Sequence, residues 1–435
     1  MHTHSFEPFW PIAKIREEGV YFYGEAIESY QEDQNVRVAD HGPMTLFGSY
    51  SYLALNGHPR IDQAARDAIS RYGTGTHGAR LLAGTLEIHR ELEAELARFK
   101  GTEAAITFSS GYAANVSTIT SLVGRHDTVF CDKLNHASIV DGCGLSRARL
   151  VRFRHNDMEH LAACLADPSH PGHKLVVVDA VFSMDGDIIN LPEVSRLCRK
   201  HNALLMVDEA HSLGMLGATG RGIEEHFGLP ADTIDIKMGT LSKAIPSVGG
   251  YVAGSQRFCD FLAVQARGFI YSGALPPASA AAALEALRVI QDEPERLARL
   301  HENVCHFAAA LRAIGLPPSD SATAIFPIIC GEDWAAFRLA KYCQQRGFYV
   351  QGIPHPVVPR GSARLRVSIT AGHRKEQLDQ FAAVLRQGID ELAIPHNGRG
   401  RKPGLEVGQS RGAGGQSPAS FGIESSRSCS SSSAS

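Results

Sequence analysis

The chain has 435 residues, a formal charge of −3 and a composition typical of globular proteins. This length exceeds what one hydrophobic core usually supports, so a large domain and a smaller one are expected. Acidic and basic residues nearly balance, which gives no electrostatic reason to expect nucleic acid or an anionic membrane as partner and favours a small-molecule substrate.

The cysteine pattern and the N-terminus bear on the compartment. The nine cysteines include no C-x-x-C pair, and their odd number argues against a disulfide framework. The first ten residues lack a basic start followed by an apolar run, and no stretch reaches the roughly 18 apolar residues of a transmembrane helix. We therefore expect a cytoplasmic protein without a targeting segment or a transmembrane segment.

Four regions are expected along the chain. An N-terminal segment covers residues 1–55, a large domain residues 56–291, a smaller α+β domain residues 292–395, and a tail residues 396–435. The tail is rich in glycine and serine, so it cannot bury enough apolar surface to offset the entropy lost on ordering. We expect it to be disordered.

The large domain alternates helical and strand patterns, which predicts an α/β fold with a mostly parallel sheet and helices on both faces. Apolar residues in Leu86–Lys100 recur at steps of three and four, which predicts an amphipathic helix. Short apolar runs predict buried strands at Ala104–Phe108, Thr128–Cys131, Leu150–Phe153, Leu175–Val178, Leu204–Val207 and Thr233–Met238.

The segments that follow these strands are candidates for the functional site. In an open parallel sheet, the loops that leave the carboxyl ends of the strands converge on one crevice. The segments expected to meet there are Ser109–Tyr112, Asp179–Gly186, Asp208–His211 and Thr240–Lys243.

The smaller domain has a different pattern. After Asp292 the sequence predicts a long helix, a strand at Ala324–Cys330, a second helix through Tyr342, and strands at Tyr349–Gly352 and Leu365–Ile369. This mixture indicates an α+β domain.

Asp208 and His211 stand at the end of a predicted buried strand, and burying them costs stability unless a partner is present. A protonated pyridine ring is one such partner, because a carboxylate beside the ring nitrogen keeps the ring cationic and able to accept the electrons of a carbanion. The alternative is an aspartate that caps the next turn. For this motif alone, both interpretations stay open.

Lys243 follows the strand that comes next in the chain, after Met238-Gly239-Thr240-Leu241-Ser242. A lysine in an apolar crevice has a destabilised ammonium, so it can form a Schiff base and later carry a proton. Thr240 and Ser242 can hydrogen-bond a phosphate. Most lysines near strand ends are solvated, but Asp208 one strand earlier makes the functional interpretation the stronger one.

Two further motifs support a cofactor site. Ser109-Ser110-Gly111-Tyr112 follows a strand and opens a predicted helix, so its backbone amides can bind phosphate, although a plain N-terminal cap explains the same pattern. His136 also follows a strand, where an imidazole can stack on a pyridine ring. A single histidine is more often structural.

Nicotinamide and metal sites are not expected. Gly73-Thr74-Gly75-Thr76-His77-Gly78 has the spacing of a dinucleotide fingerprint, but a helix-patterned segment, not a strand, precedes it and no helix follows directly. The scattered histidines have no acidic or cysteine ligands at metal-site spacing.

These motifs together resemble those of the α-oxoamine synthases, over about Phe47–Leu392. The matching segments, besides those of Asp208 and Lys243, are Gly84-Thr85, Arg152–Asp157, Phe182–Asp187, Gly217–Gly222, Tyr271–Pro277 and Ala363–Arg366. The resemblance implies a fold-type I transferase dependent on pyridoxal 5'-phosphate (PLP), a homodimer or heterodimer with the active site between subunits. It implies condensation of a small amino acid (serine, alanine or glycine) with an acyl-CoA or acyl-carrier thioester and loss of carbon dioxide.

The resemblance also implies roles for individual residues. Lys243 would hold the cofactor and move the α-proton, Asp208 would pair with the pyridine nitrogen, His211 would bond the phenolic oxygen, and His136 would stack on the ring. Arg366 matches an arginine that binds the substrate carboxylate, for which its planar cation is suited. Further cofactor contacts would come from Gly111, Tyr112, Ser183, Thr240 and, from the other subunit, Ser272.

The sequence also departs from the family. Tyr50 or Ser51 stands where many members have an asparagine that touches the substrate, and Ala79 stands where several have serine or threonine. Ser242–Gly250 is more similar to serine palmitoyltransferases than to the glycine-using enzymes. Two rivals stay open, an aminotransferase of the same fold and a non-catalytic partner subunit, and the presence of Lys243 argues against the second.

Overall fold

The computed structural model describes residues 12–20, 25–32, 34–170, 172–316, 318 and 323–395. Contacts join the described residues into one unit. The predicted tail, residues 396–435, lies outside the described residues. The predicted domain boundaries at residues 55 and 291 stay a prediction.

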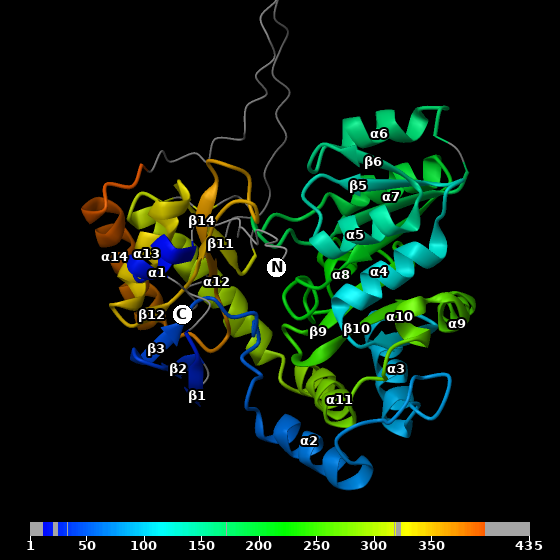
Figure 1. Cartoon of the computed structure of the whole chain (residues 1–435), viewed down its shortest axis with the longest axis horizontal. Coiled ribbons are helices and arrows are strands. Elements are labelled where there is room, and N and C mark those ends of the chain that lie inside the picture. The colour runs from blue at the N-terminus through cyan, green and yellow to red at the C-terminus, as the bar shows by residue number, and fades with distance from the viewer. Residues whose placement is uncertain are drawn as a thin grey trace, which may run out of the picture. The chain divides into compact units, whose positions relative to one another are not determined.

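A seven-stranded sheet dominates the fold, in the order β4-β10-β9-β8-β7-β5-β6 (Figure 1). Its strands are β4 (Ala104–Phe108), β5 (Thr128–Asp132), β6 (Arg149–Phe153), β7 (Lys174–Asp179), β8 (Ala203–Asp208), β9 (Ile236–Ser242) and β10 (Pro246–Gly254). The pairs from β9 to β6 are all parallel, whereas β10 runs antiparallel to both neighbours. The predicted α/β class and its mostly parallel sheet are therefore confirmed.

The end of β9 differs from the prediction. Thr240 and Ser242 were expected in a loop, but both still belong to the strand. The reason is β10, which the sequence did not predict because Gly249 and Gly250 interrupt its apolar pattern. Its pairing of Gly250 with Thr240 and of Pro246 with Ser242 extends β9 toward Lys243.

Helices cover both faces of the sheet because neighbouring strand residues point to opposite sides. In β7, Val176 and Val178 belong to one core cluster, whereas Leu175 and Val177 belong to the other. The first cluster includes residues of α3 (Glu87–Lys100), α6 (Met158–Ala166), α7 (Leu191–Lys200), α8 (Ile223–His226) and α11 (Pro277–Asp292). The second includes residues of α4 (Gly111–Leu122), α5 (Ala137–Ser146), α9 (Gln256–Gln265) and α10 (Arg267–Ile270).

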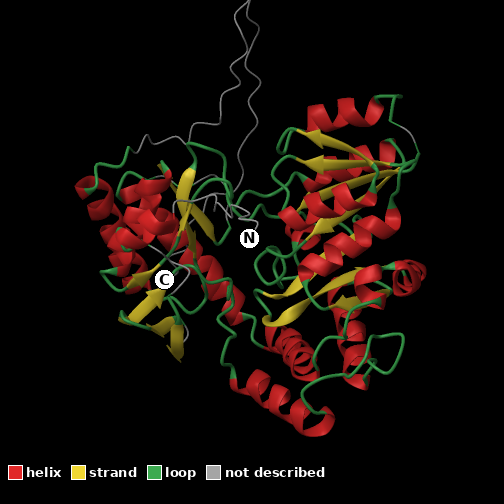
Figure 2. Cartoon of the chain, in the orientation of Figure 1, coloured by secondary structure: helices red, strands yellow, loops and turns green. Residues whose placement is uncertain are grey.

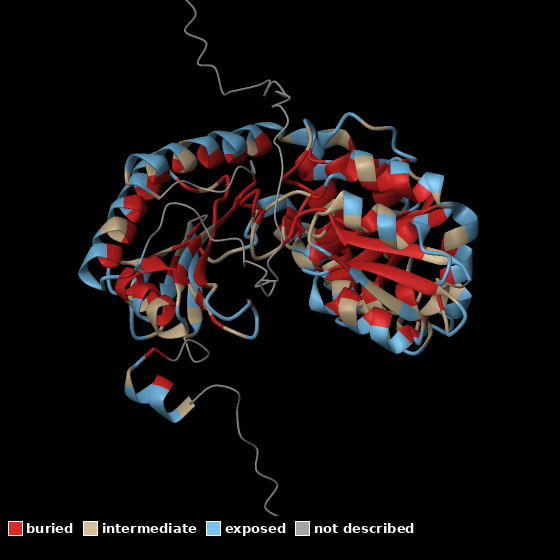
Figure 3. Cartoon of the chain, turned by 90° about the horizontal axis from the view of Figure 1, so that it is seen from above, coloured by how far each residue is buried: buried red, intermediate tan, exposed pale blue. Residues whose placement is uncertain are grey.

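The burial pattern matches this layered arrangement. Strands of the sheet are drawn mostly as buried, and the covering helices carry exposed outer faces (Figure 3). The predicted amphipathic helix is α3, which buries Leu92, Leu96 and Phe99 and ends at Gly101 in the left-handed conformation.

Two smaller sheets complete the described chain (Figure 2). One contains β1 (Ile27–Glu32), β2 (Asn35–Val38), β3 (Gly42–Leu46) and β12 (Phe348–Tyr349), and the other β11 (Ile325–Gly331), β14 (Ala363–Ser368) and β13 (Gly352–Ile353). The remaining helices are α1 (Ile12–Glu17), α2 (Pro59–Tyr72), α12 (Glu295–Ala313), α13 (Asp333–Gln344) and α14 (Lys375–Glu391).

The single strand predicted at Tyr349–Gly352 is wrong. The chain forms two short strands there, and they belong to different sheets: β12 pairs with β3, and β13 pairs with β14. Local sequence pattern does not show this, because the partner of β12 lies about 300 residues earlier in the chain.

Two further observations bear on membranes and on dinucleotides as binding partners. In the part of the chain that the structure describes, no helix is both long enough and apolar enough to cross a membrane. The segment before Gly73 is helix α2, as predicted, and α3 begins only at Glu87, so Gly73–Gly78 does not join a strand to a helix.

Candidate active site

The predicted segments meet at the carboxyl end of the parallel strands, around Asp208. The Asp208 side chain is buried and accepts hydrogen bonds from Asn115 Nδ2 at 2.7 Å and from the Ala210 backbone at 2.9 Å. Asn115 lies on α4 and also donates to Ser138 of α5. Helices on one face of the sheet therefore fix the carboxylate at the strand end.

Lys243 lies beside His211. Lys243 Nζ is 2.8 Å from His211 Nε2, and His211 Nδ1 is 2.7 Å from the Tyr52 hydroxyl. Among the described residues, no carboxylate lies within ion-pair distance of Lys243. The amine therefore has a neutral neighbour and not a counter-ion in direct contact.

The surroundings lower the pKa of both Lys243 and His211. Burial, opposed by the Asp208 charge and reinforced by Arg366, lowers the pKa of Lys243 to about 8. Burial, with the nearby charges of Lys243 and Arg366, holds the pKa of His211 well below its usual value. A neutral imidazole thus faces an amine that loses its proton near physiological pH, which suits covalent chemistry and proton transfer.

His136 occupies the N-cap of α5, at the end of the segment that follows β5. Its ring Nδ1 lies 2.7 Å from the Ser138 hydroxyl, and its backbone N–H donates to Asp179 Oδ2 at 2.7 Å. Burial is the main cause that lowers the pKa of His136. The pKa of Asp179 is raised well above its usual value by burial and by the charge of Asp208.

The predicted phosphate-binding segment opens α4. Ser110 is the N-cap and accepts a hydrogen bond from the Ala113 backbone. A Cβ placed on Gly111 would lie only 3.2 Å from Thr240 Oγ1, so glycine allows the loop to approach β9 closely. Thr240 Oγ1 lies 2.8 Å from Ser242 Oγ. Hydroxyl groups and a helix N-terminus therefore lie together, as a phosphate requires.

Ser272 and Tyr112 differ in their position relative to this segment. The resemblance gives Ser272 a role from the other subunit, but within one chain its hydroxyl lies 3.5 Å from Ser109 Oγ. Tyr112 is half-exposed, and its hydroxyl donates to Asp141 at 2.5 Å. Its backbone remains at the start of α4.

Arg366 is a buried guanidinium on β14. Its Nε donates to the Ser183 carbonyl at 2.6 Å, and Nη1 donates to Ser368 Oγ at 2.8 Å. Its Nη2 is buried without a hydrogen-bond partner among the described residues. Two bonds hold the group in place, and the two N–H groups of Nη2 remain for a ligand. The contact with Ser183 uses the backbone carbonyl of that residue.

Tyr50 is one of the two residues, with Ser51, that stand where the family resemblance led us to expect asparagine. Its ring centroid lies 4.7 Å from Arg366 Cζ and 5.7 Å from Lys243 Nζ. An aromatic ring beside two cations is an electrostatically favourable arrangement. Because Tyr50 is also 41% exposed, it stands at the entrance side of this group. Ala79 pairs with Gly273 in an isolated bridge.

Three residues of the site received no role from the sequence, although one of them, Asp179, begins a segment that was expected there. Tyr52 and Asn115 bond His211 and Asp208, and Asp179 bonds the backbone of His136. Asn115 lies one turn after Gly111 on the helix that the phosphate-binding motif opens, so helical periodicity was a usable signal for it. Nothing local distinguished Tyr52.

The arrangement fits PLP. Among the described residues, Asn115 Oδ1 and Arg366 Nη2 are buried without partners. Together with the Asp208 carboxylate, the Lys243 amine and the helix start at Gly111, they supply contacts for a cationic ring, a carbonyl carbon, a phosphate and a substrate carboxylate.

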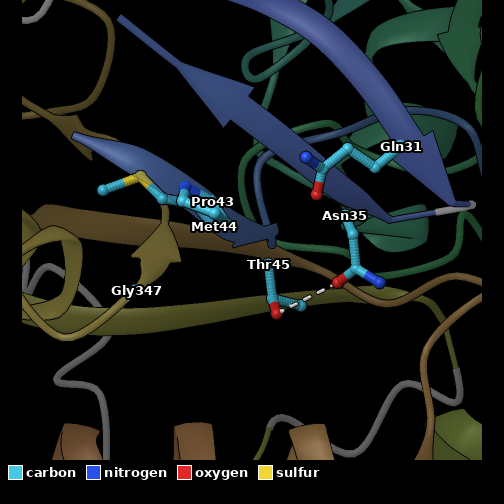
Figure 4. Close-up of a pocket in the computed structure, with 6 residues that line it drawn as sticks. All are labelled: Gln31, Asn35, Pro43, Met44, Thr45 and Gly347. Carbon is cyan, nitrogen blue, oxygen red and sulfur yellow. Dashed lines mark hydrogen bonds between the residues drawn. The ribbon is translucent and has the colours of Figure 1, made fainter. Parts of the chain in front are cut away.

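A separate cavity of about 480 Å³ lies against the N-terminal sheet (Figure 4). It is lined by Gln31, Asn35, Pro43, Met44, Thr45 and Gly347. Thr45 donates to Asn35 at 3.5 Å there. Among the lining residues that the structure describes none is titratable, and none of the residues around Asp208 and Lys243 lines this cavity.

Comparison with known proteins agrees with this site. Residues 43–385 match the family model for aminotransferase class I and II. An 8-amino-7-oxononanoate synthase of Geobacter sulfurreducens is 46% identical over 387 residues, which cover 88% of this chain and 98% of that protein.

Solved structures are similar as well. A serine palmitoyltransferase with a PLP internal aldimine has a TM-score of 0.84 and 33% identity, covering 88% of this chain and 96% of that one. An 8-amino-7-oxononanoate synthase from Francisella tularensis has a TM-score of 0.70 and 29% identity, covering 81% of this chain and 99% of that one.

Proposed function

We propose that this chain, which belongs to the aminotransferase class I and II family and is a PLP-dependent α-oxoamine synthase, makes 8-amino-7-oxononanoate. The enzyme condenses a small amino acid with an acyl thioester and releases carbon dioxide. The observation that carries the choice of product is the identity of 46% along almost the whole length of the Geobacter sulfurreducens enzyme.

The product name defines the substrates by carbon count. Decarboxylative condensation joins the acyl carbon to the α-carbon of the amino acid, breaks the acyl carbon–sulfur bond and removes the amino acid carboxylate as carbon dioxide. A nine-carbon chain with a methyl group beside the amine therefore requires L-alanine. The remaining seven carbons come from a thioester of a seven-carbon dicarboxylic acid, pimelate.

The residues that would hold PLP come from both faces of the sheet. Lys243 would bind its carbonyl carbon, Asp208 the ring nitrogen and His211 the phenolic oxygen, while His136 would stack on the ring. The phosphate and the remaining cofactor contacts would involve Gly111, Tyr112, Ser183, Thr240, Ser242 and Ser272. When bound, PLP supplies a cationic ring that takes up the electron pair left at the substrate α-carbon when its proton is removed.

The protein provides the proton transfer and the orientation. Lys243, with a pKa of about 8, exists partly as the free amine at neutral pH and can accept the α-proton. Arg366 directs its unpartnered Nη2 donor to the amino acid carboxylate. The negative charge of Asp208 favours a cation beside it, and its bonds to Asn115 and Ala210 keep it in place.

Tyr50 supports a small amino acid as substrate. Its ring covers the same side of Arg366 and Lys243 that an amino acid bound to both would occupy. A bulky aromatic ring leaves less room beside the α-carbon than asparagine does. A methyl side chain fits this restriction better than a larger group.

Product analysis tests the proposal. The purified enzyme with PLP is incubated with L-alanine, L-serine or glycine against pimeloyl-CoA or palmitoyl-CoA, and products are identified by mass spectrometry while free thiol is counted. We expect 8-amino-7-oxononanoate and one equivalent of coenzyme A from L-alanine and pimeloyl-CoA, and neither from Lys243→Ala. Preference for L-serine with palmitoyl-CoA would overturn the substrate assignment. A keto acid without thiol release would indicate an aminotransferase.

We also propose a cytoplasmic homodimer with shared active sites. The buried thiols of Cys131, Cys143 and Cys198 are free, which fits a reducing compartment. Mixing inactive Lys243→Ala subunits with inactive Ser272→Asp subunits tests the sharing. Recovered activity in the mixture is expected if Ser272 acts across the interface, and none if it acts beside Ser109 in its own chain.

A further inference from the structure

Tyr52 lies behind His211, on the side opposite Lys243. The Tyr52 side chain is fully buried, and its hydroxyl lies 2.7 Å from His211 Nδ1. Lys243 Nζ lies 2.8 Å from the other ring nitrogen, Nε2. The three side chains therefore form one continuous line of hydrogen bonds, with the imidazole in the middle.

The chemistry of each group restricts how this line can be protonated. A neutral imidazole has one N–H donor and one acceptor nitrogen, and an ammonium can only donate. When Lys243 is protonated, Nε2 must accept, so the ring proton stands on Nδ1 and the Tyr52 oxygen accepts it. When Lys243 is a free amine, it can accept from Nε2–H, and Tyr52 can then donate to Nδ1.

Tyr52 is able to serve both arrangements. Burial raises the pKa of its phenol, so the hydroxyl keeps its proton and can either donate or accept. Burial also keeps His211 neutral, because it holds the pKa of the imidazole well below the usual value. A side chain without a hydroxyl offers neither contact.

We propose that Tyr52 is a positioning residue that allows His211 to change its tautomer as Lys243 gains or loses a proton. The inference rests on the proposed role of Lys243. In this step the Nδ1–H bond of the imidazole breaks and an Nε2–H bond forms, Lys243 releases its own proton to the solvent that reaches its partly exposed side chain, and the hydroxyl of Tyr52 rotates from acceptor to donor. In both arrangements each ring nitrogen of His211 keeps a hydrogen-bond partner.

Other charged and titratable groups face this line. Lys243 is influenced by the carboxylates of Asp208 and Asp179 and by the Arg366 guanidinium, and its ammonium lies near the Tyr50 ring. His211 is influenced by Arg366 and His136. The Arg366 guanidinium also faces the Tyr52 phenol. Removing the Tyr52 hydroxyl also changes the surroundings of Arg366, and a His211→Gln background separates that change from an effect transmitted by the imidazole.

The proposal predicts a specific effect of the substitution Tyr52→Phe. Without the hydroxyl, a proton on Nδ1 of His211 has no acceptor in the buried site, so the ring favours the Nε2–H tautomer. That tautomer presents a donor to the Lys243 ammonium and disfavours it. We expect the pKa of Lys243 in the cofactor-free protein to fall by about one unit below that of the wild type.

The test measures Lys243 without using catalysis. Cofactor-free protein is treated with trinitrobenzenesulfonate at a series of pH values, and mass spectrometry of the Lys243 peptide gives the rate at each pH, because only the free amine reacts. Tyr251→Phe is the matched control: Tyr251 is also fully buried, but its hydroxyl has no hydrogen-bond partner among the described residues. We expect the control to leave the Lys243 pKa unchanged.

A double substitution identifies the path of the effect. In a His211→Gln background, adding Tyr52→Phe should not move the Lys243 pKa, because the imidazole that transmits the effect is absent. An unchanged pKa in folded Tyr52→Phe, or the same shift in the His211→Gln background, would overturn the proposal. Neither result depends on which substrates the enzyme uses.

A measurement on the wild type applies even if Tyr52→Phe does not fold. Nitrogen-15 NMR of histidine-labelled, cofactor-free protein reports the ring tautomer, and comparison with His211→Gln assigns the signal. We expect His211 to move from Nδ1–H toward Nε2–H as the pH rises through about 8, where Lys243 loses its proton. A tautomer that stays constant from below to above that pH contradicts the proposal.

Discussion

Two lysines on or next to β9 have different partners. Lys237, near the start of the strand, is fully buried, forms an ion pair with Glu224 at 2.5 Å and donates to the Lys100 carbonyl at 3.0 Å. Lys243, just beyond the end, is partly exposed and has the neutral His211 ring as its hydrogen-bond partner. Burial lowers the pKa of both.

The comparison shows that burial alone does not make a lysine reactive. Glu224 opposes the effect of burial on Lys237 and leaves its ammonium with a counter-ion. Lys243 lacks such a contact, so its free amine is accessible near neutral pH. Three experiments test this difference, beginning with the largest expected effect, and a fourth tests Arg366 beside Lys243.

Lys243→Ala should abolish synthesis. We expect the turnover to fall by more than about 1,000-fold, because both the covalent attachment of PLP and the proton acceptor are lost. The visible absorbance band of bound PLP should disappear. Steady-state thiol release and an absorbance spectrum of the purified protein measure the two effects. A variant that retains the band would show that another lysine holds the cofactor.

Lys237→Ala should act on stability instead. Removing the ammonium leaves Glu224 buried without its partner, and we expect the free energy of unfolding to fall by about 3–5 kcal/mol. Urea unfolding of the cofactor-free protein measures the loss. The double variant Lys237→Met/Glu224→Gln removes both charges and should recover part of it. A Lys237→Ala protein as stable as the wild type would remove the contrast between the two lysines.

Lys243→Met should stabilise the cofactor-free protein at neutral pH. The native pKa of about 8 lies below the ordinary lysine pKa of 10.5, which holds in the unfolded chain, so the unfolded state binds more protons between these values. Wild-type stability should therefore rise with pH across this window and be lowest below pH 8. We expect the variant to gain about 2–3 kcal/mol at pH 7, because the side chain is only partly exposed, and the gain to vanish near pH 10.5.

Urea unfolding of both proteins from pH 7 to pH 10.5 gives the difference directly. Other groups titrate in this range, but they are shared by the two proteins and cancel in the comparison. A stability difference that does not depend on pH would mean that Lys243 has an ordinary pKa in the native state.

Arg366→Lys should affect binding of the amino acid more than turnover. The planar guanidinium of Arg366 donates to the Ser183 carbonyl and to Ser368 and keeps Nη2 for a ligand. The single ammonium of lysine cannot make all three contacts. We expect KM for the amino acid to rise roughly 10- to 100-fold, which corresponds to the loss of one charged hydrogen bond. Initial rates at varied amino acid and fixed thioester measure it, and an unchanged KM would place the carboxylate elsewhere.

Much of the site was predictable because its residues stand at strand ends. The apolar run Leu204–Val207 predicts that Asp208 ends a buried strand, and Asp208 does end β8. Parallel strands open on one side of a sheet, so the position of one such residue indicates where the others meet. The helix start after β4 followed from the serines and the glycine at Ser109–Gly111 in the same way.

The hydrogen-bond partners of the site residues were not predictable, because these partners come from distant parts of the chain. Tyr52 is 159 residues before His211, and Asn115 is 93 residues before Asp208. β10 was missed because its glycines hide the strand pattern, and its pairing with β9 fixes where Thr240 lies. Helical periodicity places Asn115 near Gly111, but neither periodicity nor motif spacing shows which distant residue a side chain contacts.

The sequence by itself determined the α/β class, the strands that end in Asp208 and precede Lys243, and the resemblance that points to PLP. Only the tertiary structure decided which lysine is paired with a carboxylate and which with an imidazole. The physical reason is that alternation and helical periodicity depend on neighbours in the chain. The acidity of a buried amine depends on whatever side chains the fold brings within a few ångströms of it.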